Sequence, residues 1–382
     1  MRAFAALTAF AVLPAAAQVV HNPATDIEGP AVEVIGIVPV PGLGTALPDI
    51  PATVQSAGTE ELRGRGARDI VEHMERSFAG ATLGSAQGNP FQQDLMYRGF
   101  AASPLLGVPQ GLSVYVDGVR VNESFGDTVN WDLIPRNTIS TMHLLSGSNP
   151  VFGLNTLGGV LSIQTKSGFA FPGTAASVDA GSFGRRSAAT EHGGHGESAD
   201  WFVAANAQDE AGWQPHSSSR LRQAFAKGGW QDSRTDVDVS LALANNALEG
   251  AQTLPLGMLG SPRQAYTWPD RTENSLAFLT ARASRYVRDD VLVAGSAYLR
   301  QLRQANVSSN VNDAFDPALA VGPGNSQGLN DRTVLDQMMA GASLQVSMDG
   351  ALWGSLNRLT LGASLDRANA DFAQDEQEAM FS

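Results

Sequence analysis

The stretch Gly147-Ser-Asn-Pro-Val-Phe-Gly-Leu-Asn-Thr-Leu-Gly-Gly-Val-Leu-Ser-Ile-Gln-Thr-Lys-Ser-Gly168 organises this chain. It begins as a glycine-rich loop, which contains Gly147, Gly153, Gly158 and Gly159. A segment follows at 160–165 in which apolar and polar residues alternate, and a Lys-Ser-Gly turn closes the stretch. Alternation with a period of two is typical of a β-strand with one buried face.

Two shorter segments precede this stretch, at 94–100 and 111–121. The first ends in Arg98-Gly99-Phe100, and the second places Asp117-Gly118 between Val-Tyr-Val and Val-Arg-Val. An Asp-Gly pair between such runs predicts a tight hairpin, because primed turns need the positive φ that Asp and Gly tolerate.

Together the three segments resemble the plug domain of TonB-dependent outer-membrane receptors. The resemblance covers residues 31–170 well and the rest of the chain only as a pattern of strands. It implies a mainly β protein, in which an antiparallel transmembrane β-barrel encloses a small α+β plug. The plug motifs that it assigns are Arg98, Gly99, Phe100, Asp117, Gly118, Gly147, Gly153, Gly158 and Gly159.

Composition agrees with a strand-rich protein of more than one domain. The chain has 382 residues, of which 40 are glycine and only 16% are charged. The net charge of -13 argues against a nucleic-acid partner, which would require clustered Lys and Arg. The absence of cysteine excludes disulfides, Cys-ligated metals and thiol nucleophiles.

The N-terminus has the features of a secretory signal peptide over residues 1–17. Arg2 supplies the charge, residues 3–13 the apolar stretch and Ala15-Ala-Ala17 the cleavage site. No later segment has 18 consecutive apolar residues, so a membrane-spanning form of the chain would have to be a closed β-barrel. We therefore expect export to the outer membrane of a Gram-negative cell.

Residues 18–49 are expected to form a flexible linker that contains a TonB box. The short apolar segment consists of Val32, Glu33, Val34, Ile35, Gly36, Ile37 and Val38, followed by Pro39 and Pro41. Such a segment suits β-augmentation, in which it adds a strand to a partner sheet. The resemblance implies that this partner is the TonB energy-coupling protein. An ordinary first strand of the next domain is the alternative reading.

Residues 50–170 are expected to form the plug. A helix is predicted over 68–78, with Ile70, Val71, Met74 and Phe78 on its core face. The resemblance implies that apical loops of the plug contact the ligand, although these residues would also suit packing against the barrel wall. The candidates are Asn89, Phe91, Gln92, Ser103, Leu105, Leu106, Phe125, Asp127, Asn130 and Trp131.

One segment departs from the family pattern. At 139–147 the family usually has a carboxylate and an arginine, and the resemblance implies that this arginine joins Arg98 in a charge lock with barrel glutamates. This chain has His143 and Ser146 there. Half of that lock is therefore missing or replaced.

Residues 171–382 are expected to form the N-terminal part of the barrel. Nine strand candidates follow one another, with alternating faces and alternately short and long connections. They are 175–180, 186–191, 201–208, 221–229, 236–245, 275–287, 291–303, 334–347 and 359–369. Plugged transporters have roughly 22 strands, so we expect a longer barrel of which these nine are a truncated part.

The residues do not predict catalysis, a cofactor or a metal site. His192-Gly-Gly-His195 fits a polar hairpin turn, and no phosphate loop or nucleophile motif is present. The remaining hypotheses are an importer of a scarce ligand and a non-transporting surface receptor or adhesin. A ferric siderophore is the default ligand by resemblance, with cobalamin, haem, nickel chelates and oligosaccharides open.

Overall fold

The computed structural model describes residues 34–35, 45–46, 52–59, 61, 69–85, 88–148, 152–153, 155–352 and 355–380. All of them belong to one compact unit, Val34–Ser382. We call the large C-terminal sheet the wall, and residues 52–170, which carry two smaller sheets, the plug. No helix among the described residues is long and apolar enough to cross a lipid bilayer.

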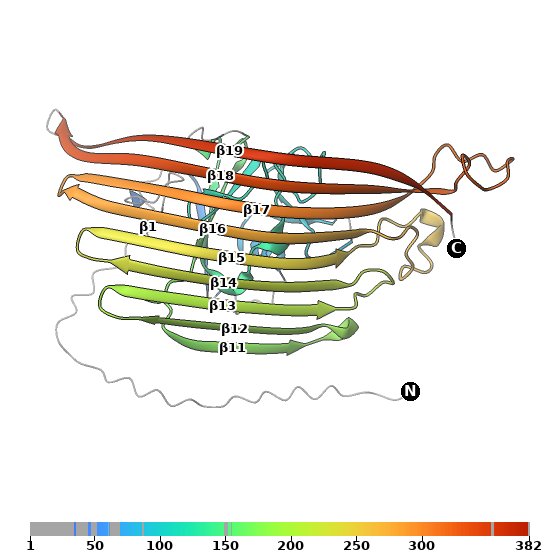
Figure 1. Cartoon of the computed structure of the whole chain (residues 1–382), viewed down its shortest axis with the longest axis horizontal. Coiled ribbons are helices and arrows are strands. Elements are labelled where there is room, and N and C mark those ends of the chain that lie inside the picture. Colours follow the sequence, from blue (N-terminus) through green and yellow to red (C-terminus); the bar gives the residue numbers. More distant parts are fainter. Residues whose placement is uncertain are drawn as a thin grey trace. The chain divides into compact units, whose positions relative to one another are not determined.

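The wall is a sheet of nine antiparallel strands that neighbour one another in chain order, coloured green to red in Figure 1. Each predicted strand is present and longer than predicted. Within the described residues, the first and last strands do not pair with each other. The strands are β11 (Gly173–Ala180), β12 (Arg186–His195), β13 (Ala199–Glu210), β14 (Ser219–Gln231), β15 (Thr235–Glu249), β16 (Arg271–Arg288), β17 (Val291–Val311), β18 (Gly328–Leu352) and β19 (Ser355–Ala379).

The two faces of the wall differ as the alternation predicts. On β15, Leu241 and Leu243 are 38% and 43% exposed, whereas Ser240 and Ala244 are 8% and 6% exposed. The apolar row therefore faces away from the plug, and the small and polar row lies against it. This alternation is typical of strands that face lipid on one side and a filled lumen on the other.

The ends of several strands differ from the prediction. Gly193 and His195 lie inside β12 and do not form a turn; the connection to β13 is 196–198. Residues predicted to be loops at 246–249, 271–274, 304–311 and 328–332 extend the strands instead. These segments are polar but pair through their backbones, which the apolar alternation does not reveal.

The plug contains two small sheets. The larger has the strand order β3-β9-β10-β7-β8, and the smaller has the order β4-β5-β6. Strand β10, the predicted strand of the opening stretch, pairs parallel with β7 and antiparallel with β9. The strands are β3 (Val54–Gly58), β4 (Ala81–Gly84), β5 (Asp94–Tyr97), β6 (Phe100–Ala102), β7 (Leu112–Val116), β8 (Val119–Arg120), β9 (Ile139–Ser146) and β10 (Gly159–Thr165).

The predicted helix is confirmed as α2 (Ile70–Ser77). The Asp69 side chain caps it by accepting a hydrogen bond from the Glu72 N–H at 2.9 Å. Ile70, Val71 and Met74 are buried in the plug core, as expected from their helical spacing.

The motif residues shape the turns of the plug. Asp117 and Gly118 have φ of 48° and 81°, which is the predicted primed hairpin turn between β7 and β8. The ring of Phe100 packs where a Cβ on Gly158 would come within 2.4 Å of it. A side chain at Gly158 would therefore displace this ring.

The plug and the wall share no strand pairing within the described residues, because all three plug and wall sheets are separate. Apolar packing joins them, since Ala244, Leu276, Phe278 and Leu302 of the wall belong to the same buried cluster as the plug core. Contacts between plug and wall are thus made by side chains and not by a shared backbone ladder.

Candidate functional site

The first polar contact between plug and wall is at the β7–β8 hairpin. Asp117 is buried, and its carboxylate accepts hydrogen bonds from the N–H and the hydroxyl of Thr165, at 2.9 Å and 2.5 Å. Lys227 on β14 and Arg282 on β16 approach the same carboxylate, at 3.7 Å and 3.8 Å. The hairpin tip of the plug is therefore held by two cations of the wall.

Burial alone would raise the pKa of Asp117. The charges of Lys227 and Arg282 and the hydrogen bonds from Thr165 outweigh that effect and lower the pKa to about 2. Asp238 lies between the two cations and accepts from the Arg282 guanidinium at 2.5 Å. Asp117 is therefore ionised throughout the physiological pH range.

A second contact joins Glu123 to Arg300 on β17. Both side chains are buried, and the guanidinium donates to both carboxylate oxygens, one of them at 2.7 Å. Asn130 and Gln337 also donate to this carboxylate, at 3.1 Å and 3.4 Å. A buried bidentate pair of this kind is strong only while both partners are present.

A third contact places Asp132 against three wall strands. Asn274 donates to its two carboxylate oxygens at 3.1 Å and 3.0 Å, and Asn246 donates to one of them at 2.9 Å. Gln223 donates to its backbone carbonyl at 2.5 Å. Burial raises the pKa of Asp132 to about 6, because the amide hydrogen bonds offset only part of the cost of desolvation.

A fourth contact lies where the opening stretch ends. The Lys166 ammonium is 2% exposed and donates to both oxygens of Glu191 on β12, at 2.9 Å and 2.7 Å. It also lies 5.3 Å and 5.8 Å from the ring centres of Phe171 and Phe202. The Lys-Ser-Gly turn therefore anchors the end of the plug to the wall.

The segment that departs from the family pattern makes hydrogen bonds within the plug. His143 shares a hydrogen bond with Ser56 at 2.9 Å, and Ser146 shares one with Tyr97 at 2.5 Å. Arg98 is exposed, and its guanidinium lies 5.2 Å from the centre of the Tyr97 ring. Within the described residues, no ion pair of Arg98 is found, so the charged contacts between plug and wall lie elsewhere.

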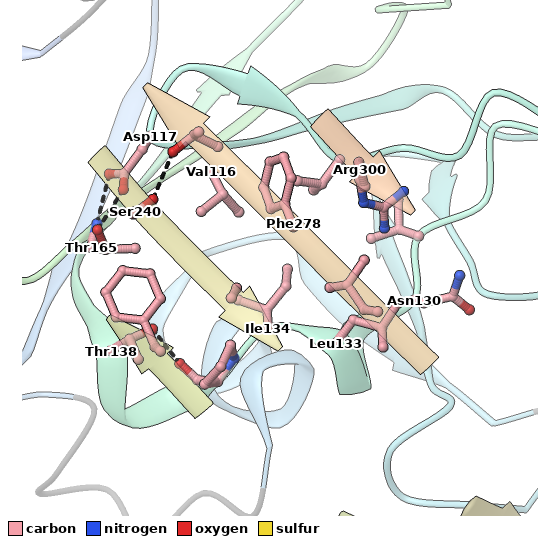
Figure 2. Close-up of a pocket in the computed structure, with 17 residues that line it drawn as sticks. Val116, Asp117, Asn130, Leu133, Ile134, Thr138, Thr165, Ser240, Phe278 and Arg300 are labelled. Carbon is pink, nitrogen blue, oxygen red and sulfur yellow. Dashed lines mark hydrogen bonds between the residues drawn. The ribbon is translucent and has the colours of Figure 1, made fainter. Parts of the chain in front are cut away.

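A cavity of about 40 Å³ lies between the plug and strands β14–β17. Leu133, Ile134 and Phe278 give it mostly apolar walls. Figure 2 shows Asp117 and Thr165 at one end of the cavity and Arg300 and Asn130 at the opposite end. The first two polar contacts thus flank a gap in the apolar packing.

The predicted ligand-contact residues fall into two groups. Asn89, Phe91, Gln92, Ser103, Asn130 and Trp131 are buried. Several of them bind the wall or the plug itself: Asn89 donates to Ser219 at 2.9 Å, and Trp131 donates to the Ala102 carbonyl at 3.3 Å. In this structure these residues contribute to packing.

The other group remains accessible. Leu106 and Phe125 are exposed, while Leu105 and Asp127 are half-buried. The Phe125 ring stacks on Phe372 of β19 with 4.9 Å between ring centres, and Phe372 is itself exposed. This pair joins a loop of the plug to the inner face of the wall.

The loop that carries Phe125 is firmly held. Its Ser124 hydroxyl and Phe125 N–H both donate to Gln337, at 2.6 Å and 3.2 Å. Asp127 accepts from Arg120 at 2.8 Å and from Asn155 at 2.6 Å. An aromatic side chain is therefore presented at a fixed position.

Most of the predicted TonB box lies outside the described residues, namely Val32, Glu33, Gly36, Ile37 and Val38. Its two described residues form strand β1 (Val34–Ile35), which pairs antiparallel with β2 (Thr45–Ala46).

Sequence reasoning missed Lys227, Arg282, Arg300, Asp132 and Phe372. Two signals were available. The chain has only two lysines, Lys166 and Lys227, and both are buried at the contact. Lys227 also falls on the alternating face of β14 that carries the buried Phe225, where a cation needs a partner.

Plug sheets docked by side chains on the inner face of an antiparallel wall, whose outer face is apolar, define a plugged outer-membrane β-barrel architecture. Residues 46–160 match the model of the TonB-dependent receptor plug domain. The ferric aerobactin receptors of Klebsiella pneumoniae and Escherichia coli are 32% and 31% identical over 142 residues, which is 37% of this chain and 17% of theirs.

Solved structures extend the likeness to the wall. The ferric citrate transporter FecA aligns with a TM-score of 0.69 and 12% identity, over 86% of this chain and 49% of its own. The ferric preacinetobactin receptor BauA of Acinetobacter baumannii aligns with a TM-score of 0.69 and 13% identity, over 90% and 50%. This chain spans about half of each structure. Residues 46–160 are therefore similar to the plug domain of TonB-dependent receptors, and the chain as a whole has the fold of these plugged barrels.

Proposed function

We propose that this receptor imports a scarce ligand across the outer membrane by energy-coupled displacement of its plug. The separation of plug and wall sheets carries the proposal. Because no backbone ladder joins them within the described residues, moving the plug requires the rupture of side-chain contacts only. Such contacts reform after each cycle without refolding of a sheet.

The energy would come from the TonB protein at the periplasmic face, through residues 32–38. In the described part of this region, β1 pairs with β2 along one edge. Its other edge would accept a strand of TonB by β-augmentation. We further propose that a signal peptide over residues 1–17 is cleaved during export.

The ligand class that we propose is a ferric siderophore. This proposal is supported by the similar proteins, which are receptors for ferric aerobactin and other ferric chelates. Phe125 and Phe372, with Leu105, Leu106 and Asp127 nearby in the plug loops, are our candidates for ligand contact. Binding and transport, with no chemical change of the ligand, suffice for this role.

Uptake and surface binding must be measured separately to test this function. Ferric aerobactin labelled with radioactive iron is supplied to cells that carry the receptor or a variant lacking 33–38. The deletion should abolish uptake and preserve surface binding, whereas a control deletion of 25–30 should affect neither. Uptake that survives loss of 33–38 would contradict energy coupling through this segment.

A non-transporting surface receptor is the alternative. It is favoured by His143 and Ser146, which stand where the family has part of a charge lock and which hydrogen-bond to Ser56 and Tyr97 of the plug. In that case both deletions would leave surface binding intact, and no iron would enter the cell.

A further inference from the structure

Asp132 is the one carboxylate of the three central plug–wall contacts, Asp117, Glu123 and Asp132, that meets no cation among the described residues. It lies in the short 3-10 helix η2 (Trp131–Leu133) and is 3% exposed. Its hydrogen-bond donors are the neutral amides of Asn246 and Asn274. An ionised carboxylate is costly in such a position, because amide dipoles offset the loss of hydration only in part.

The same cluster contains an acceptor without a donor. The Oδ1 atom of Asn274 is buried and has no hydrogen-bond partner within the described residues. The amides of Asn246 and Gln223 do not have this deficit, because Asn246 accepts from the Arg222 N–H at 3.1 Å and Gln223 accepts from Asn206 at 2.9 Å. Protonation of Asp132 adds an O–H donor to a cluster whose unpaired atom is an acceptor.

The charged groups near Asp132 also favour its protonation. Glu123, in the preceding loop of the plug, is the charged group that acts on Asp132, and its negative charge raises the Asp132 pKa. Arg300 is committed to Glu123 through two hydrogen bonds. In the part of the chain that the structure describes, the side chains of β14, β15 and β16 that hydrogen-bond to Asp132 are those of Gln223, Asn246 and Asn274, and none of these amides titrates.

We propose that Asp132 and Asn274 form a proton-binding site between plug and wall, and that occupancy of this site strengthens plug docking. The burial of Asp132, its neutral amide donors and the unpaired Oδ1 atom of Asn274 support the proton site whatever the function of the receptor. Its use, as a control of how readily the plug is displaced, rests on the proposed import function.

The direction of the effect follows from the pKa, which is about 6 in the docked plug and ordinarily 3.8. A raised pKa means that docking takes up a proton. The docking advantage is complete below about pH 4, decreases as the pH rises through about 6, and is absent at pH 7.5. The docking constant should decrease more than tenfold between pH 4.5 and pH 7.5, because each unit of pKa difference corresponds to about a tenfold change.

Infrared spectroscopy of the receptor in outer membranes detects the proton directly. The wild type should show a carbonyl band of a protonated, buried carboxyl group that disappears with a midpoint near pH 6. The band should be absent from Asp132→Asn, in which the added amide mimics the protonated acid. Absence of the band from the wild type at pH 5 would overturn the proposal.

Hydrogen exchange of residues 129–138, corrected for the intrinsic pH dependence of exchange, measures docking. The wild type should be protected more than tenfold better at pH 4.5 than at pH 7.5, and Asp132→Asn should be equally protected at both. Asp94→Asn, a control at a half-buried plug carboxylate that accepts from Ser103, should behave as the wild type. A full pH dependence that persists in Asp132→Asn would also refute the site.

Transport is a separate readout. A normal infrared band and normal exchange, together with no uptake of ferric aerobactin at pH 5.5 or pH 7.5, would confirm the proton site and count against import. Uptake that is unaffected by Asp132→Asn at both pH values would show that the site does not control displacement.

Discussion

Asp117 and Asp132 are both buried carboxylates of the plug, yet the wall offers them different partners. Asp117 meets Lys227 and Arg282, and its pKa is lowered to about 2. Among the described residues, Asp132 accepts hydrogen bonds from amides, and its pKa is raised to about 6. One interface therefore contains a contact that acid weakens and a contact that acid strengthens. Burial is common to both, so the partner decides the sign.

Replacing a carboxylate by an amide should have opposite consequences at Glu123, which faces a wall cation, and at Asp132, which faces none among the described residues. Glu123→Gln leaves Arg300 buried without a counter-charge, which should weaken plug docking by about 3–5 kcal/mol. Asp132→Asn at pH 7.5 removes a charge that no cation balances, and should be neutral or stabilising. The urea concentration at which hydrogen-exchange protection of residues 129–138 is lost measures both effects.

The double variant Glu123→Gln with Arg300→Gln is the matched control for the larger effect. It removes both charges and should recover part of the loss. An equal loss in Glu123→Gln and Asp132→Asn would show that the cation makes no difference and would remove the basis of the comparison.

Acid should weaken the contact at Asp117. Its lowered pKa means that its stabilisation is present above about pH 4 and is lost as the pH falls through about 2. The difference between 3.8 and about 2 corresponds to about 2 kcal/mol. Docking measured from pH 7.5 to pH 2 should therefore increase to a maximum near pH 4 and then decrease. In Asp117→Asn the decrease below pH 4 should be smaller, while the increase above it should remain.

The stacked rings of Phe125 and Phe372 should contribute less to the free energy of plug docking, and their contribution should not depend on pH. A double-mutant cycle with Phe125→Ala and Phe372→Ala should give a coupling of about 1 kcal/mol, as expected for an aromatic pair. The coupling should be the same at pH 4.5 and pH 7.5. A pH-dependent coupling would mean that the ionisable contacts and the aromatic pair are not independent.

The smallest effect is expected for an ion pair outside the interface. Asp349 accepts from Arg358 at 2.6 Å and 2.9 Å near the β18–β19 turn, but both side chains are more than 40% exposed. Asp349→Asn should cost less than about 1 kcal/mol, and the cost should vanish in concentrated salt. A cost as large as that of Glu123→Gln would show that burial does not determine the strength of these pairs.

Local signals predicted most of the fold. The alternation of Leu241 and Leu243 with Ser240 and Ala244 fixed the faces of β15, because one lipid-facing row requires apolar residues at every second position. The Asp117-Gly118 turn was equally predictable, since few residue pairs tolerate two positive φ values. Both features depend on residues that are close together in the chain.

The contacts of the site were not predictable in this way. Glu123 and Arg300 are 177 positions apart, and Asp132 and Asn274 are 142 apart. Their meeting depends on how the plug sits against the wall, which periodicity does not encode. Asp69 and Glu72 illustrate the same limit, because charged residues at a helix are ordinarily expected on its solvated face, whereas the structure buries these two.

The two lysines of this chain can report chemically where the contact between plug and wall opens. Lys166 and Lys227 are its only two lysines, and their side chains are 2% and 5% exposed where plug and wall meet. An amine-selective acylating reagent will modify them only where that contact opens. The acylated peptides that contain Lys166 or Lys227 then identify by mass which end of the contact has opened, on living cells and without a label.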